Sequence, residues 1–390
     1  MGCRLCRSKY CDGKNCQIIG IIKKYSPKKV DTHFFGSSPP AVFVGTYNYP
    51  NVYAGILAPA LHDEFSYKND SPEEWFREKL SIEEILGKRS SMIYSRFQNS
   101  VKQRGKFIDV MQEISMSSRI CDVEFYLKEK PRLEISFNSF RAPIGNPAPL
   151  KKAVVTENIK VHNKVEKFVG DTDIKSTDSI NELHASGIPV TNISKLLSSG
   201  LLGMKKNRKL TPTRWSITAV DDIISKKLID KIKTFPIISD YIVFHDEYLG
   251  NHYEILLIPS VWGFEVIEMD SIFNVWQDYE NYFGKKGYAS SVTGAYYANR
   301  LGACEYLAKI KRQASVLVLR EIKDAYWAPC GVGILREVTR SAFNNKPQAF
   351  ITEKEALTDI QNRIKSPLYF SKSRILNEKK EQLLLNKFLA

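Results

Sequence analysis

Four of the seven cysteines lie within the first sixteen residues of this 390-residue chain. They are spaced C-x2-C-x4-C-x4-C, and they are Cys3, Cys6, Cys11 and Cys16. Polar, basic and turn-forming residues surround them, so this short segment has no apolar core of its own. Four thiolates around one Zn²⁺ ion would hold such a segment together. The spacing therefore predicts a C4-type structural zinc module over residues 1–18.

Other uses of these thiols stay open. Two disulfides would need an oxidising compartment, and an iron–sulfur cluster also takes four cysteine ligands. The spacing is similar to that of zinc knuckles, which bind single-stranded nucleic acid, with Cys11 where those modules carry a histidine. The other three cysteines are isolated. We expect Cys121 and Cys304 in the core and Cys330 in a loop, where its thiol could react.

The last residues of the chain form a second motif, Q-x-x-L-x-x-F-L. Residues three apart lie on one side of a 3₁₀ turn, so Leu385 and Phe388 would form an apolar plug that Leu389 widens. Such short peptides dock into hydrophobic pockets of partner proteins, and this one closely resembles the PCNA-interacting peptide (PIP motif) of sliding-clamp partners. The alternative is a last helix that packs on its own domain. The motif consists of Gln382, Leu383, Leu384, Leu385, Asn386, Lys387, Phe388 and Leu389.

Composition narrows the class of protein. Hydrophobic residues make up 43% and charged residues 26% of the chain, a balance that excludes global disorder. No apolar run is long enough for a membrane-spanning helix, and the N-terminus lacks a secretory signal, so we expect a cytoplasmic protein without a membrane partner. The net charge of +14 favours a polyanionic partner such as DNA, although excess lysine is also seen as plain compositional bias.

The positive charge is concentrated between residues 200 and 235, where nine Lys and Arg face three Asp. The candidates for DNA contact there are Lys205, Lys206, Arg208, Lys209, Arg214 and Trp215. Cations around a turn could contact the phosphate backbone of DNA, and the tryptophan of the neighbouring Arg-Trp pair could stack on a base. The alternative is a solvated loop with Trp215 in the core. We expect Asp221 and Asp222 to precede a helix that one of them caps, or else to bind a metal.

Residues 36–40, Gly-Ser-Ser-Pro-Pro, predict a shaped loop before a short strand at 42–44. The hydroxyls of Ser37 and Ser38 could hold a phosphate or carboxylate there, or the segment is only a rigid turn. The G-x-x-x-x-G-K-[ST] phosphate loop is absent, so an NTPase is not supported. An enzyme would need Ser37, Ser38, Arg214, Asp221 and Asp222 around one cleft, and whether the protein is an enzyme stays uncertain.

These segments need a body to position them, and the sequence predicts a mixed α/β (α+β) body over residues 19–375. Strands are expected at 242–244, 254–258, 264–268 and 315–319, and helices at 221–232 and 294–308. A polar stretch at 157–186 reads as a surface excursion or a joint, and residues 376–390 as a flexible clamp-binding tail. Six charged residues are expected near the ends of helices and strands, where they could line an anion-binding cleft or form an ion-pair network. They are Arg300, Arg312, Arg320, Glu321, Arg336 and Glu337.

Together these features resemble the archaeal Nre family of DNA-repair proteins. The resemblance spans nearly the whole chain and rests on the cysteine cluster, residues 35–45, residues 213–222, the segment 294–314 and the C-terminal motif. It implies repair of DNA damage coupled to the PCNA sliding clamp, in a nucleoid-associated protein, and it implies no particular reaction. Three hypotheses follow: a clamp-tethered repair factor that binds DNA, a DNA- or nucleotide-processing enzyme, and a non-catalytic binding scaffold.

Overall fold

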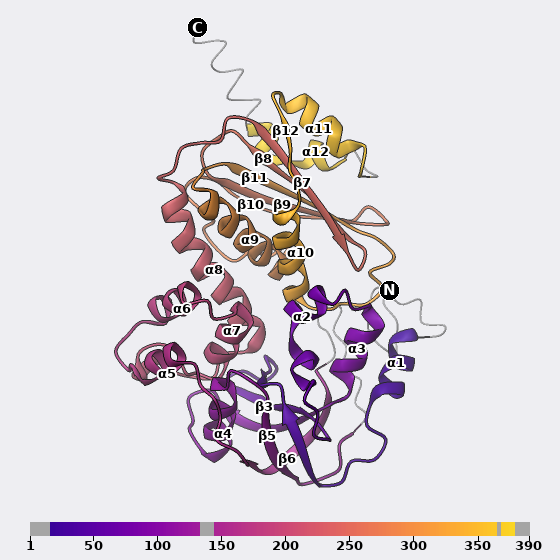
Figure 1. Ribbon diagram of the computed structural model, residues 1–390, viewed down its shortest axis with the longest axis vertical. Helices are drawn as coiled ribbons and strands as arrows, with labels where there is room; N and C mark the ends of the chain where they lie inside the picture. Colours follow the sequence, from indigo (N-terminus) through magenta and orange to yellow (C-terminus); the bar gives the residue numbers. More distant parts are fainter. Residues whose placement is uncertain (1–15, 133–143, 365–367, 379–390) are drawn as a thin grey trace. The chain divides into compact units, whose positions relative to one another are not determined.

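The computed structural model describes residues 16–132, 144–364 and 368–378 (Figure 1). Three cysteines of the predicted zinc module, Cys3, Cys6 and Cys11, and the whole motif at 382–389 lie outside these residues. The chain divides into two compact units. Unit 1 contains Met1–Ile223 and Trp327–Gly331, and unit 2 contains Ile224–Tyr326 and Val332–Ala390. The first boundary falls inside helix α8 (Thr213–Ile232).

Unit 1 is built on a six-stranded sheet with the order β1-β5-β6-β4-β3-β2. Neighbouring strands are antiparallel except β4 and β6, which are parallel. The strands are β1 (His33–Ser38), β2 (Ala41–Val44), β3 (Asn51–Pro59), β4 (Met92–Ser100), β5 (Cys121–Leu127) and β6 (Asn146–Val155). The strand predicted at 42–44 is thus confirmed as part of β2.

The sheet of unit 1 curls so that β1 approaches the end of β3. A Cβ atom at Gly36 would lie 2.0 Å from the carbonyl oxygen of Pro59, so only glycine fits there. The prediction of a shaped loop at residues 36–38 is therefore wrong, because these residues belong to β1. Their small side chains permit the close approach of β3, and the Ser38 hydroxyl donates a 2.9 Å hydrogen bond to the Leu57 carbonyl.

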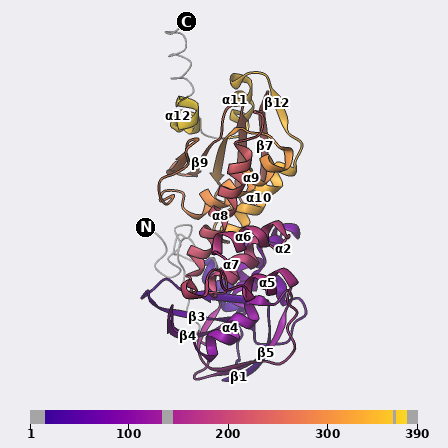
Figure 2. The same ribbon diagram turned by 90° about the vertical axis from the view of Figure 1, so that its left-hand side faces the viewer.

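Helices cover this sheet and extend beside it. Apolar side chains of α4 (Ile108, Met111 and Ile114) are buried in the same core as those of the strands. The polar stretch at 157–186 contains two helices, α5 and α6, and Figures 1 and 2 show them beside α7. The helical elements are α1 (Gln17–Tyr25), η1 (Ser66–Asp70), α2 (Pro72–Arg77), α3 (Ile82–Ser90), α4 (Lys106–Met116), α5 (Asn163–Gly170), α6 (Ser176–Ala185), α7 (Val190–Ser198) and η2 (Lys205–Asn207).

The helix α8 begins earlier than the sequence predicts. Asp221 and Asp222 lie inside it and do not precede it, so the prediction that one of them caps a helix is wrong. Serine and threonine are poor helix formers because their hydroxyls compete for backbone groups. Here those hydroxyls bond back to the previous turn, with Ser216 and Thr218 donating to the carbonyls of Pro212 and Arg214. These hydrogen bonds allow α8 to begin at Thr213 although its first turns are rich in serine and threonine.

Unit 2 is a second mixed sheet with helices on both faces. Its strand order is β10-β9-β11-β8-β7-β12, and only β9 and β11 are parallel neighbours. All residues of β8 and β11 are buried, as expected for strands covered on two faces. The strands are β7 (Tyr241–Tyr248), β8 (Asn251–Ile258), β9 (Gly263–Asp270), β10 (Val275–Glu280), β11 (Ser315–Ile322) and β12 (Gln348–Phe350).

In Figure 1, α9 (Gly294–Ile310) and α10 (Val332–Asn344) lie on one face of this sheet, and α11 (Glu353–Gln361) and α12 (Leu368–Lys372) on the other. The mixed α/β body is confirmed, as are the four strands predicted in unit 2 and the helix predicted from residue 294. Within the described part of the chain, no helix is both long enough and apolar enough to cross a bilayer.

Candidate nucleic-acid interface

Three segments of unit 1 that are distant in sequence meet beside the basic segment. The Val101 amide donates to the carbonyl of Pro50 at 3.0 Å, and the Leu210 amide donates to the carbonyl of Val101 at 2.9 Å. Gly200, which follows α7, has a φ of +72°, and a Cβ atom there would lie 2.7 Å from the Lys209 carbonyl oxygen. These contacts fix the residues after β4 against the turn before β3 and against residues 199–210.

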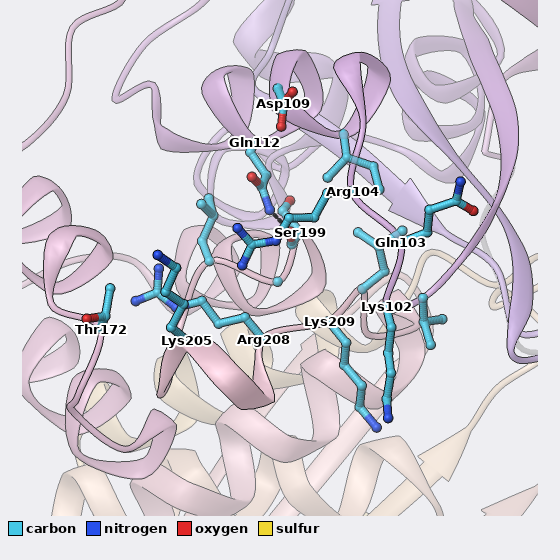
Figure 3. A pocket seen from close by; sticks show the side chains of 15 residues that line it. Lys102, Gln103, Arg104, Asp109, Gln112, Thr172, Ser199, Lys205, Arg208 and Lys209 are labelled. Carbon is cyan, nitrogen blue, oxygen red and sulfur yellow. Dashed lines mark hydrogen bonds between the residues drawn. The ribbon is translucent and has the colours of Figure 1, made fainter.

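A pocket of about 160 Å³ lies where these residues meet (Figure 3). Five basic side chains and one carboxylate line it: Lys102, Arg104, Lys205, Arg208, Lys209 and Asp109. One wall is held by the Gln112 amide, which donates to the Ser199 carbonyl at 2.8 Å. The excess of positive charge makes this pocket attractive to anions such as phosphate groups.

Most of these cations are exposed. Lys102, Arg104 and Lys205 form no ion pair with any residue that the structure describes. The Lys209 ammonium lies 3.4 Å from the Tyr49 hydroxyl, to which it donates. Lys102 and Lys209 extend in the same direction in Figure 3. Cations without a protein carboxylate remain free to neutralise an external anion.

Arg208 differs from its neighbours, because its guanidinium faces backbone carbonyls. It donates to the carbonyls of Gly203, Val169 and Asp171 at 2.7, 2.8 and 2.6 Å, and so joins the basic segment to the end of α5. Burial lowers the pKa of Arg208 from its usual value. The geometry makes Arg208 a brace that positions the lysines, while a DNA contact by Arg208 stays a prediction.

Trp215 lies in the first turn of α8 and is 45% exposed, so the alternative that placed it in the core is wrong. Its ring centroid is 5.1 Å from that of Tyr49, which is 41% exposed. Arg214 and Lys206 are exposed as well, but neither lines the pocket. No local pattern in the sequence points to Tyr49, Lys102 or Arg104, because only tertiary hydrogen bonds bring their segments to the basic segment.

The predicted serine site has a different character. Ser37 is fully buried, and its hydroxyl donates to Asp122 Oδ1 at 2.7 Å. His62 Nδ1 lies 3.0 Å from this hydroxyl and 3.1 Å from the same Asp122 oxygen. A nucleophilic serine needs to be exposed and to give its proton to a base, whereas Ser37 is covered and faces the carboxylate directly. Ser38 is fully buried too, and Asp221 is buried within α8.

The remaining cysteines and metal candidates can also be located. Cys121 and Cys304 are buried as expected, but Cys330 is buried as well, and burial raises the pKa of its thiol. The loop position expected for Cys330 is confirmed, but its burial opposes the reactivity that its thiol could have had there. Cys16 is a free, half-buried cysteine at the N-cap of α1. Among the described residues, no group of three His, Cys, Asp or Glu side chains is placed to hold a metal ion.

Comparison with known proteins gives the family. Residues 5–277 match the family described as "Archaeal Nre, N-terminal", and residues 280–388 match "Archaeal Nre, C-terminal". The chain belongs to the archaeal Nre family. The two Nre regions meet near the end of β10, whereas the division into compact units falls within α8.

Curated Nre relatives cover nearly the whole chain. A protein of Archaeoglobus fulgidus named "DNA repair protein NreB" is 35% identical over 98% of this chain and 99% of its own length. The same organism's "DNA repair protein NreA" is 35% identical over 93% and 94%, respectively. The protein of that name in Haloferax volcanii is 32% identical over 91% and 89%. No solved structure matches this Nre chain.

Proposed function

We propose that this protein is a DNA-repair factor that binds DNA through the basic pocket of unit 1 and is recruited to the PCNA sliding clamp by its C-terminal residues. The names of its Nre relatives support the repair role. The observation that supports DNA binding is the composition of the pocket, which is lined by five basic side chains and only one carboxylate. Neutralising DNA phosphates releases counterions, which favours binding and makes it dependent on salt.

Clamp recruitment is supported by the C-terminal sequence and by the way in which the preceding residues are held. The buried carboxylate of Glu265 in β9 accepts hydrogen bonds from the Ser373 hydroxyl at 2.6 Å and from the Arg374 amide at 2.8 Å. Ile375 and Leu376 are buried in the same core as α11. The motif at 382–389 therefore begins a few residues after an anchored point. A short tether raises the effective concentration of the DNA-binding unit near the clamp.

The experiment removes the motif and measures two affinities. Deleting residues 382–390 should abolish binding to PCNA in a pull-down or calorimetric titration and leave DNA affinity in the absence of the clamp unchanged. The pair Leu385→Ala and Phe388→Ala should act in the same way, while Asn386→Ala with Lys387→Ala is the matched control at non-defining positions. Clamp binding that survives the deletion would contradict the recruitment proposal.

A structural zinc ion at Cys3, Cys6, Cys11 and Cys16 is part of the same proposal, with the spacing as its support. Purified protein should contain about one zinc per chain, and Cys3→Ser with Cys6→Ser should lose it, as measured by elemental analysis. Zinc content that is unaffected by this pair would rule out the module. We place the protein in the cytoplasm at the nucleoid, where its proposed partners are.

A DNA- or nucleotide-processing activity has less support. The cleft predicted for it needs the hydroxyls of Ser37 and Ser38, which are buried and hydrogen-bonded within the sheet of unit 1. A binding scaffold without DNA affinity is separated from our proposal by titration with DNA at low salt, where the scaffold would show no binding.

A further inference from the structure

Two aromatic rings of unit 1 form an exposed pair. Tyr49, in the turn before β3, and Trp215, in the first turn of α8, are 41% and 45% exposed. Their ring centroids are 5.1 Å apart and the rings are tilted by 55°. Aromatic side chains gain most when they are buried, so a pair that remains half in water is available to a partner with a flat apolar face.

The pair is continuous with the basic pocket. Lys209 lines the pocket, and its ammonium donates to the Tyr49 hydroxyl at 3.4 Å. Lys102 lines the same pocket and follows Val101, whose amide is bonded to the carbonyl of Pro50 beside Tyr49. The exposed side chain of Arg214 adjoins Trp215 in the sequence. Rings and cations thus belong to one surface of unit 1.

Both rings are carried by fixed backbone. The Trp215 amide donates to the Pro212 carbonyl at 2.8 Å, and the Thr218 hydroxyl donates to the Trp215 carbonyl at 3.2 Å. The turn that carries Tyr49 is closed by the Asn51 amide, which donates to the Asn48 carbonyl at 2.8 Å. A preformed platform loses little conformational freedom when it binds.

We propose that the Tyr49–Trp215 pair stacks on an unpaired DNA base while the pocket lysines neutralise neighbouring phosphates. The protein then prefers single-stranded or gapped DNA to intact duplex, because a base offers its face to a side chain only when it is not stacked inside a helix. Base stacking on aromatic side chains tolerates any sequence, so the preference is for DNA structure. This inference rests on the proposed DNA binding and adds the class of DNA.

The test compares single-stranded oligothymidine of about 16 nucleotides with a duplex of equal length, by fluorescence anisotropy on the full chain. Trp215→Ala and, separately, Tyr49→Ala should weaken single-strand binding by about 5-fold or more and change duplex binding by less than about twofold. Trp215→Phe keeps a ring and should retain most of the affinity. Phe283→Ala, which removes an 89% exposed ring in unit 2, is the matched control and should have no effect.

A second readout is intrinsic fluorescence. Oligothymidine should quench the wild-type tryptophan signal, and Trp215→Phe should remove most of this quenching. Trp215 is 45% exposed, whereas Trp75 and Trp262 are buried and Trp276 and Trp327 are only partly exposed. Single-strand affinity that is unchanged in both alanine variants would overturn the stacking inference. Equal losses for single strand and duplex would overturn it as well.

The two proposals fail differently. If Lys102→Ala with Lys209→Ala weakens binding while the aromatic variants do not, DNA binding stands and stacking is wrong. If the wild-type protein binds neither DNA at low salt, the proposed function itself is contradicted.

Discussion

Two groups of charged side chains, one in each unit, are placed in opposite ways. In unit 2, Arg320 is buried and paired with Glu268 at 2.6 Å, and Arg300 is buried and paired with Glu280 at 2.7 Å. In unit 1, the lysines of the pocket are exposed, and within the part of the chain that the structure describes Lys102 and Lys205 have no carboxylate partner. These arginines of unit 2 are enclosed within the fold, whereas the pocket lysines of unit 1 are presented to solvent.

This difference shows which positive charges indicate a polyanionic partner such as DNA and which serve the fold. A buried arginine that is paired with a carboxylate is occupied inside the fold and is not available to DNA. The network interpretation of Arg300 and Arg320 is therefore favoured over an anion-binding cleft. Of the excess of +14, the charges that indicate a polyanion are the clustered, unpaired ones of the pocket.

The largest effect is expected from breaking a buried pair of unit 2. Arg320→Met leaves the Glu268 carboxylate buried without its cation, which should lower the free energy of unfolding by about 3–5 kcal/mol. Chemical denaturation followed by circular dichroism measures it. The double variant Arg320→Met with Glu268→Met should recover most of the loss. A loss below about 1 kcal/mol in the single variant would contradict the described burial.

A smaller effect is expected from the arginine of unit 1 that resembles those of unit 2. Arg208→Met removes three hydrogen bonds to the carbonyls of Gly203, Val169 and Asp171. Since the position is only partly buried, we expect a loss of about 1–3 kcal/mol in the free energy of unfolding. Arg104→Met is the matched control from the same pocket, with an expected change within about 0.5 kcal/mol. Equal losses of stability in the two variants would contradict the view that Arg208 supports the fold whereas Arg104 does not.

The smallest effect on stability is expected from the pocket lysines. Replacing Lys102, Lys205 and Lys209 with Ala should change the free energy of unfolding by no more than about 0.5 kcal/mol per substitution. Their side chains are exposed, and in the described structure they hold no carboxylate. A large destabilisation in thermal unfolding would mean that these cations serve the fold.

The two units also differ in how well the sequence predicts their secondary structure. The strands of unit 2 carry continuous apolar runs such as 315–319, and the structure confirms them because local composition and burial agree. In unit 1 local signals mislead. Gly36, Ser37 and Ser38 suggest a loop, yet close packing against β3 makes them a strand. The hydroxyls of Ser216 and Thr218 in α8 donate to backbone carbonyls of the preceding turn.

The candidate site was predictable only in part. The basic segment and its neighbour Trp215 were visible as a local concentration of Lys and Arg beside an aromatic residue, but the sequence left open whether Trp215 lies in the core. Lys102 and Tyr49 were not, because backbone bonds of Val101 to Pro50 and of Leu210 to Val101 bring them there. No spacing along one segment encodes contacts of this kind.

The central claim is that the unpaired cations of unit 1 bind DNA phosphates. The most direct measurement is the salt dependence of single-stranded DNA affinity in the wild-type protein and in the triple variant of Lys102, Lys205 and Lys209. We predict that the logarithm of the wild-type association constant falls steeply with the logarithm of salt concentration, and that the triple variant reduces this slope by about 2, or about 0.7 per lost phosphate contact. Identical slopes in the two proteins would contradict the account.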